Sequence, residues 1–239
     1  EDEDEERRLA QVLLQRQVDG ILVVTAGQGA ETIRLCREHE VACVAVDRPP
    51  ADGGVDVVRA DAEGGAHELG QLLAGLGHQR IVILTGPASV RTASDRVAGF
   101  RRAVVDEAGL QEPQVIHGAF TIDSGHAMAL EAMQAVPRPT AVFAANNFIA
   151  IGVLHALDEL GLRVPEDVAV VGFDDLPEAM VTFPFLTVVA QPAFEIGRES
   201  VSVLLSRLGD PDSPPRQVVL PARLVIRRSS GRPVTAGAR

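Results

Sequence analysis

The sequence predicts an α/β protein with parallel sheets, and three observations carry this prediction. Short apolar runs bounded by turn residues, such as VDGILVV and AVFAA, alternate along the chain with longer stretches whose apolar residues recur at helical spacing. Such short runs, apolar throughout, are typical of parallel strands buried on both faces. The 239 residues, 46% of them hydrophobic, suffice for one large domain or two small ones with a packed core.

The first half of the chain opens on a predicted helix at about 5–17. Its acidic residues come first, where they favour a helix N-terminus, and Leu9, Val12 and Leu13 fall at helical spacing. Helices are also expected at about 30–38 and in AHELGQLLAGLGH, whose leucines form one stripe. Strands are expected at 21–25, in VACVAV, which ends at Asp47, and in VDVVRAD, which is a short strand or a crossover.

The second half of the chain repeats this alternation. Strands are predicted at 81–85, in VIHGAF, at 141–145, at 168–173 and at 187–191, with one or two more in VVLPARLVIR. Helices are predicted at about 93–108, in DSGHAMALEAMQA, in NFIAIGVLHALDELG and in AFEIGRESVSVLLSRLG. Gly109 ends the first of these helices, and Pro137 follows the second. The tail SSGRPVTAGAR is expected to be disordered.

Composition argues against several classes of protein. The net charge of −11 disfavours a broad grip on nucleic acid, because neutralising phosphates needs a basic face. No window approaches the roughly 18 consecutive apolar residues of a membrane span, and the acidic start EDEDEERR is the opposite of a secretion signal. All 22 basic residues are arginine, so the chain has no P-loop lysine.

Signals for catalysis and for metal binding are weak. Gly27 and Gly29 resemble the start of a dinucleotide-binding turn, but Thr32 stands where a third glycine belongs. The six histidines are scattered without H-x-x-x-H spacing, and no G-x-S-x-G occurs. Cys36 and Cys43 form no C-x-x-C pair and are too few for a disulfide framework. We therefore expect no enzyme, no metal and no cofactor.

Polar side chains gather where the predicted strands end, and ligands of open α/β sheets bind outside the carboxyl ends of the strands. This rule selects an arginine, a serine, carboxylates, amides and one ring: Asp47, Ser94, Asp95, Arg96, Phe120, Asn146, Asp174, Asp175 and Gln191. The planar guanidinium of arginine donates several hydrogen bonds, and aspartate accepts hydrogen bonds from vicinal hydroxyls. The amides both donate and accept, and an aromatic ring covers an apolar sugar or base face. The mixture favours a neutral polyhydroxylated ligand.

Each of these residues also has a structural interpretation, and at this point both stay open. An arginine near a helix start is more often a surface or cap partner than a ligand contact. An aspartate after a strand often caps the next helix, and Asn146 or Asn147 could be the N-cap of a helix that begins at Phe148. Clustering at strand ends favours a functional role for the set as a whole.

An ordered series of segments over about 5–230 resembles the LacI/GalR family of bacterial transcriptional regulators. It includes RQVDGILVV, VACVAVDRP, SDRVAGFRRAV, LGLRVPEDVAVVGFDD and VVLPARLVIRRSS. The resemblance implies a type I periplasmic-binding-protein-like α/β fold, with two parallel-sheet subdomains that are joined by three crossovers and face each other across a cleft. The implied N-terminal subdomain is 1–60 plus 192–217, and the C-terminal one is 61–191 plus 218–230, before a tail at 231–239.

The family's effector contacts fall on residues that the strand-end rule selects. The resemblance implies that role for Asp47, Arg96, Phe120, Asn146, Asp174 and Gln191. It implies the effector-binding and dimerisation core of a cytoplasmic regulator that has no membrane partner. The small-molecule effector would be a sugar by preference, with a nucleoside still open. A homodimer would use the helix at 148–160. The alternative is a periplasmic-type sugar-binding protein for transport or sensing.

The sequence departs from the family pattern in two places. The usual A-N-D reads Ala145-Asn146-Asn147, so a carboxylate is missing. The helix-turn-helix at the family's N-terminus, and the strand, helix and strand after it, are also absent. We therefore expect this sequence to be part of a longer protein that binds operator DNA only through its missing N-terminal domain. In this fold those strands would lie beside the strand at 21–25, which is expected to leave an apolar edge unpaired.

Overall fold

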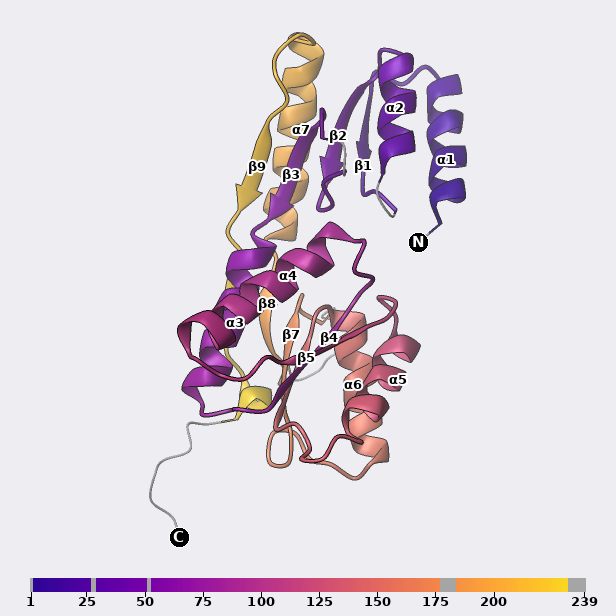
Figure 1. Cartoon of the computed structure of the whole chain (residues 1–239). Helices are drawn as coiled ribbons and strands as arrows, with labels where there is room; N and C mark the ends of the chain where they lie inside the picture. Colours follow the sequence, from indigo (N-terminus) through magenta and orange to yellow (C-terminus); the bar gives the residue numbers. More distant parts are fainter. Residues whose placement is uncertain (1, 27–28, 51–52, 177–183, 232–239) are drawn as a thin grey trace. The chain divides into compact units, whose positions relative to one another are not determined.

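A computed structural model describes residues 2–26, 29–50, 53–176 and 184–231 (Figure 1). The chain divides into two compact units. Unit 1 comprises Glu1–Asp61, Ser89–Thr92 and Pro192–Pro221, and unit 2 comprises Ala62–Ala88, Ala93–Gln191 and Ala222–Arg239. The boundary expected after residue 217 is therefore wrong, because residues 218–221 belong to unit 1. The reason is a strand pair, in which Val218 lies opposite Val58 in parallel register.

Unit 1 is a four-stranded parallel sheet with helices packed on it. Its strands are β1 (Gly20–Val23), β2 (Ala42–Val46), β3 (Asp56–Ala60) and β9 (Gln217–Leu220), and they pair in the order β1-β2-β3-β9. Its helices are α1 (Glu3–Gln15), α2 (Ala30–Glu38) and α7 (Ala193–Gly209). Side chains alternate across the sheet, so Cys43 packs with Cys36 of α2 while Val44 packs with Val203 of α7.

The first helix and the first strand differ slightly from prediction. Helix α1 begins at Glu3 because the Asp2 carboxylate accepts hydrogen bonds from the backbone N–H groups of Asp4 and Glu5. Strand β1 spans Gly20–Val23 instead of 21–25. It lies at the edge of the described sheet, and both Leu22 of the strand and Val24 after it are exposed. An apolar edge at this strand is what the sequence led us to expect. Gly27, the first glycine of the partial dinucleotide-binding pattern, lies outside the described residues.

Unit 2 is a six-stranded sheet covered on both faces. Its strands are β4 (Ile81–Thr85), β5 (Gln114–His117), β6 (Ala141–Ala144), β7 (Ala169–Phe173), β8 (Thr187–Ala190) and β10 (Arg223–Val225). They pair in the order β10-β8-β7-β6-β4-β5, and all pairs are parallel except β10 with β8. The α/β prediction with parallel sheets is therefore confirmed. Every residue of β4, β6 and β7 is buried, as expected for strands covered on both faces.

Helices of unit 2 form its two outer layers. They are α3 (Ala62–Gly75), α4 (Arg91–Arg101), α5 (Ile122–Ala132) and α6 (Asn147–Glu159). Leu69 of α3 and Phe100 of α4 pack in one core cluster, where the Phe100 and Phe143 rings stack with centroids 4.7 Å apart. Met128 of α5 and Val153 of α6 pack in the other cluster. None of the helices that the structure describes is long and apolar enough to cross a membrane.

One predicted helix changes its winding. The sequence predicts a single helix at 93–108, but the α-helix ends at Arg101 and residues Arg102–Glu107 form a π-helix. The Ala108 N–H donates to the carbonyl of Ala103, five residues back. Ala103 and Val104 of the π-helix are buried, and the apolar pattern of so short a segment could not distinguish it from α-helix.

Helices α5 and α6 lie side by side and approach closely where glycines meet (Figure 1). A Cβ added at Gly152 would lie 2.1 Å from the Ile122 carbonyl oxygen and 2.5 Å from the His126 backbone nitrogen.

Gly152→Ala is therefore expected to lower the free energy of unfolding by about 2–3 kcal/mol, measured by urea denaturation. The control is Gly75→Ala on α3, where a Cβ meets nothing within 4 Å. Equal stability of the two variants would contradict this account.

The C-terminal stretch is ordered further than predicted. Ser229 and Ser230, placed in the disordered tail on sequence grounds, are buried in a 3-10 turn at Arg228–Ser230. The Ser229 hydroxyl donates to the Val170 carbonyl at 2.6 Å and accepts from the Thr187 N–H at 2.7 Å. Two backbone groups thus depend on one hydroxyl. The rest of the tail, residues 232–239, lies outside the described residues.

Removing that hydroxyl should be costly. Ser229→Ala leaves a buried carbonyl and a buried N–H without their partner, so we expect a loss of about 2 kcal/mol in the free energy of unfolding. Urea denaturation measures this loss. The exposed Ser202 of α7 supplies the control, and Ser202→Ala should change stability little. A loss no greater for Ser229→Ala than for the control would show that the tail contributes nothing to unit 2.

Candidate functional site

The polar residues selected from the sequence lie mostly at one edge of the unit 2 sheet. Asn146, Asp174 and Gln191 follow β6, β7 and β8, which are neighbours in the sheet and run parallel. Their carboxyl ends therefore share an edge, which is where α/β sheets bind ligands. Arg96 reaches the same edge from α4 and Phe120 from the segment after β5. Asp47 occupies the matching position after β2 in unit 1.

Arg96 is a buried cation with a fixed orientation. Its side chain is 4% exposed, and its guanidinium carbon lies 3.9 Å from the ring centroid of Phe173. One Nη donates to the Ala145 carbonyl at 2.6 Å and lies 3.7 Å from an Asp174 carboxylate oxygen. Among the described residues the buried Nε has no hydrogen-bond partner. A buried donor without a partner is costly.

Asp174 is held from two sides in an unusual backbone conformation. Its φ of 67° lies in the left-handed region, which aspartate tolerates better than most residues. Its N–H donates to the Val189 carbonyl at 2.9 Å. The Gln191 amide nitrogen donates to one carboxylate oxygen at 2.5 Å, and Arg96 faces the other. Arg96, Asp174 and Gln191 are thus in contact, and the Asp174 charge balances the Arg96 charge.

Asn146 adjoins this group and caps a helix as well. Its side-chain oxygen accepts from the Ile149 N–H at 2.8 Å, so the N-cap interpretation is correct for Asn146. The amide nitrogen is not used by the cap and can serve a ligand. Because Arg96 bonds to the carbonyl of Ala145, the chain places Asn146 directly after the atom that orients the guanidinium.

Phe120 covers the end of β4. It is half-buried and packs against Gly86, where an added Cβ would lie 2.2 Å from the ring. Only glycine at position 86 leaves room for this ring. Phe120 belongs to the group by its place in the segment that follows β5, a strand of the same sheet.

Asp47 repeats the backbone geometry of Asp174 in the other unit. It follows a parallel strand, has a φ of 65° and donates its N–H to the Val58 carbonyl, on the next strand, at 2.9 Å. Asp175, by contrast, is engaged with its own unit, because both of its carboxylate oxygens accept from Arg227. These hydrogen bonds hold the pKa of Asp175 below its ordinary value against the opposing effect of burial.

Sequence reasoning missed Phe173, Gly86 and Arg227. Phe173 reads as an ordinary strand residue, and its stacking on Arg96 depends on two segments far apart in the chain. Arg227 stands in the segment VVLPARLVIRRSS, which was selected for its overall pattern, and Gly86 directly follows the strand predicted at 81–85. Within the part of the chain that the structure describes, no group of three His, Cys, Asp or Glu side chains could hold a metal ion.

Known proteins share this architecture and much of this sequence. Residues 71–230 match the family described as periplasmic binding protein-like domain. The transcriptional repressor PurR of Escherichia coli O1:K1 is 31% identical over 230 residues, which are 95% of this chain and 67% of PurR. A complex of the transcriptional regulator CelR with cellobiose is 34% identical, with a TM-score of 0.87, over 96% of this chain and 71% of CelR.

A second solved structure adds another bound sugar. A LacI family transcriptional regulator from Enterococcus faecium with bound ribose is 28% identical to this chain, with a TM-score of 0.83. The match covers 96% of this chain and 84% of that regulator. The three relatives are regulators by name, and two of them hold a neutral sugar in the structures compared.

Proposed function

Because this chain belongs to the LacI family of transcriptional regulators, we propose that it is the effector-binding core of such a regulator and that its effector is a neutral sugar. The proposed site is the group at the carboxyl edge of the unit 2 sheet, comprising Arg96, Asn146, Asp174, Gln191 and Phe120. Asp47 is its proposed counterpart in unit 1. A bound sugar would act on DNA binding of the full regulator through its different affinities for two states of the protein.

One observation carries the choice of ligand. The Arg96 guanidinium is buried and faces the Asp174 carboxylate at 3.7 Å. Its charge is therefore balanced within unit 2, which disfavours an anionic ligand such as a sugar phosphate. A hydroxyl oxygen can accept from the Arg96 guanidinium while vicinal hydroxyls donate to Asp174, whose side chain is 24% exposed, so the pair suits a polyhydroxylated neutral molecule. The sugars bound by CelR and by the Enterococcus regulator support this choice.

A thermal-shift screen tests the proposal. The purified chain is heated with neutral sugars including cellobiose and ribose, with sugar phosphates, and with nucleosides and purines. A ligand at about 100 times its dissociation constant adds roughly 2.7 kcal/mol, or about 5–10 °C for this size. We expect a shift with one or more neutral sugars. A shift with sugar phosphates alone, or turnover of the ligand that binds, would contradict the proposal.

Membership of the family supports proposals for the oligomeric state, the cellular location and the DNA binding of the regulator. We propose a cytoplasmic homodimer, with α6 at one of its contacts, and we assign operator binding to the full regulator rather than to this acidic chain. The relatives' names favour a regulator over a sugar-binding protein for transport. Sedimentation of the purified chain tests the dimer, and a monomer at all concentrations up to about 100 μM would contradict it.

A further inference from the structure

The residue after Asp174 is anchored more firmly than Asp174 itself. Both carboxylate oxygens of Asp175 accept from the Arg227 guanidinium, at 2.8 and 2.6 Å, and one also accepts from the Leu176 N–H at 2.9 Å. The Asp175 carbonyl accepts from the side-chain nitrogen of Asn147 at 3.2 Å. Side chain and backbone of one residue are thus fixed by two partners from distant parts of unit 2.

Both partners are themselves fixed. Asn147 is the first residue of α6, next to the Asn146 cap. Arg227 donates a further side-chain hydrogen bond to the Leu186 carbonyl at 2.8 Å, and its backbone N–H donates to the Thr187 hydroxyl at 2.8 Å. The turn after β7 is therefore tied to α6 on one side and to the segment between β10 and the Ser229 turn on the other.

We propose that Asn147 and Arg227 are positioning residues, which hold Asp175 so that Asp174 keeps the left-handed conformation in which it meets Arg96 and Gln191. This inference rests on the proposed function, because it assigns to Asp174 a part in ligand binding. The Asp174 backbone itself makes one hydrogen bond, from its N–H to the Val189 carbonyl. The contacts of its neighbour Asp175 restrain the backbone of Asp174 further. Neither Asn147 nor Arg227 needs to touch the ligand.

The residue type at position 147 makes the inference specific. The Asn147 amide donates to the Asp175 carbonyl, whereas the carboxylate of an ionised aspartate can only accept. In Asn147→Asp a carboxylate would face the Asp175 carbonyl, and the two would repel each other. Protonation of that carboxyl restores a donor. The variant should therefore behave like the natural chain at low pH and unlike it at high pH, which a purely structural loss would not produce.

Two readouts test the inference on the purified chain. Amide hydrogen exchange at Asp174 needs no ligand, and its protection factor in Asn147→Asp should fall about tenfold at pH 8 and recover in part at pH 4.5, where an aspartate carboxyl is partly protonated. Calorimetric titration with cellobiose, or with ribose should only ribose bind, should show about tenfold weaker binding at pH 8 and a partly recovered affinity relative to the natural chain at pH 4.5. Arg227→Lys keeps the charge but not the fork, and should lower Asp174 protection at both pH values.

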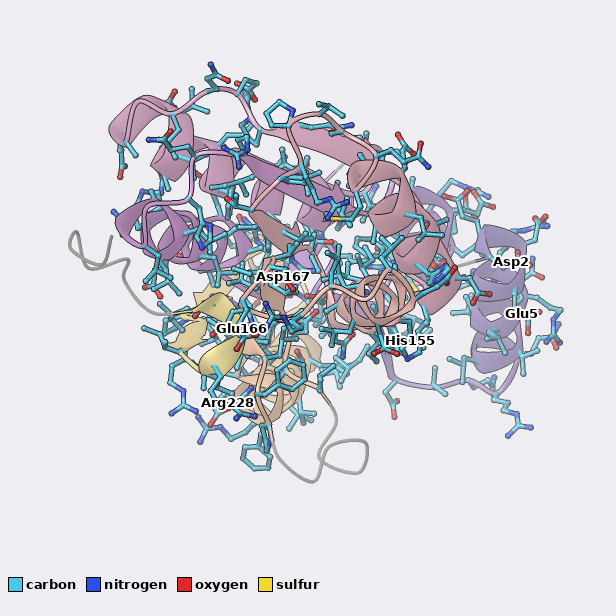
Figure 2. The ribbon with its side chains drawn as sticks, turned by 90° about the horizontal axis from the view of Figure 1, so that it is seen from below. Asp2, Glu5, His155, Glu166, Asp167 and Arg228 are labelled. Atoms are coloured by element: carbon cyan, nitrogen blue, oxygen red, sulfur yellow. The ribbon has the colours of Figure 1, made fainter. Side chains whose placement is uncertain are left out.

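Matched variants serve as controls. Arg228, labelled in Figure 2, is an exposed arginine beside Arg227, so Arg228→Lys should leave protection unchanged. Gln111→Glu is the control for the negative charge that Asn147→Asp adds, because it places the same charge at an exposed site of unit 2 and should leave Asp174 protection unchanged. An unchanged Asp174 amide in Asn147→Asp overturns the inference, as does an equal loss of protection at Asp174 and at the core residue Val142. If the natural chain binds no neutral sugar of the thermal-shift panel, the proposed function fails while the exchange result still decides the inference.

Discussion

Replacing Arg96 with alanine is expected to abolish the thermal shift produced by a neutral sugar and to lower the free energy of unfolding by about 2 kcal/mol. Binding should weaken at least about a hundredfold, because the variant loses a charged donor and the orientation of Asp174. The loss of stability follows from the Ala145 carbonyl, which loses its buried partner, and from the emptied face of the Phe173 ring.

Two further variants separate these effects. Arg96→Lys keeps the charge but neither the fork nor the stacking, so it should bind almost as poorly while losing less stability. Asp174→Asn keeps an oxygen for Gln191 and a residue type that tolerates a positive φ, so it should still fold, although the buried Arg96 loses its counter-charge and stability should fall. Calorimetry measures the sugar affinity, and urea denaturation independently measures the free energy of unfolding. Sugar binding by Arg96→Ala at the affinity of the natural chain would show that Arg96 is a structural residue only.

Replacing Asp56 with asparagine is expected to cost about 3–5 kcal/mol of stability in unit 1, or roughly 10 °C in melting temperature. The Asp56 side chain is fully buried, and Arg207 of α7 donates to both of its oxygens, at 2.8 and 3.0 Å. The Arg216 N–H donates to one of them at 2.8 Å. The variant leaves the Arg207 charge in place without its counter-charge, and this pair joins β3 to α7.

The pH dependence of this effect has a defined sign. Burial would raise the pKa of Asp56, but the hydrogen bonds from Arg207 and Arg216 outweigh it and hold the pKa below its ordinary value. A carboxyl whose pKa is lower in the folded state stabilises the protein above its unfolded pKa of about 3.9. That stability is lost as the pH falls through the folded pKa. The difference between the natural chain and Asp56→Asn should therefore shrink below about pH 4.

An exposed ion pair supplies the matched control. Asp167, labelled in Figure 2, accepts from both Nε and Nη2 of Arg163, but the Arg163 side chain is 71% exposed. Because solvent screens such pairs, Asp167→Asn should change stability little. If Asp56→Asn and Asp167→Asn lower the free energy of unfolding equally little in urea denaturation, the pair of Asp56 and Arg207 does not stabilise the packing of α7 on the sheet.

Burial decided which elements the sequence could predict. Strand β4 at Ile81–Thr85 and helix α7 at Ala193–Gly209 have the predicted bounds, because an uninterrupted apolar run and a long amphipathic stripe leave little choice. The π-helix after Arg101 and the buried turn at Ser229 were missed. In both, hydrogen-bond partners rather than apolar spacing set the structure.

The candidate site could be predicted to the level of residue types and strand ends. The end-of-strand rule brought Asn146, Asp174 and Gln191 to one edge because their strands are neighbours in a parallel sheet. It could not predict the Arg96 contact with Phe173 or the Arg227 contact with Asp175. Those pairs join segments 50 or more residues apart, and no local pattern encodes them.

Calorimetric titration of the natural chain and of Asp174→Asn with the same neutral sugar tests the central claim most directly. The account predicts saturable binding to the natural chain, binding at least about a hundredfold weaker to the variant, and a cooperative melting transition of both proteins without sugar. The phosphorylated form of that sugar should bind the natural chain more weakly. Equal sugar affinity in the two proteins would contradict the claim that the carboxyl edge of the unit 2 sheet is the effector site.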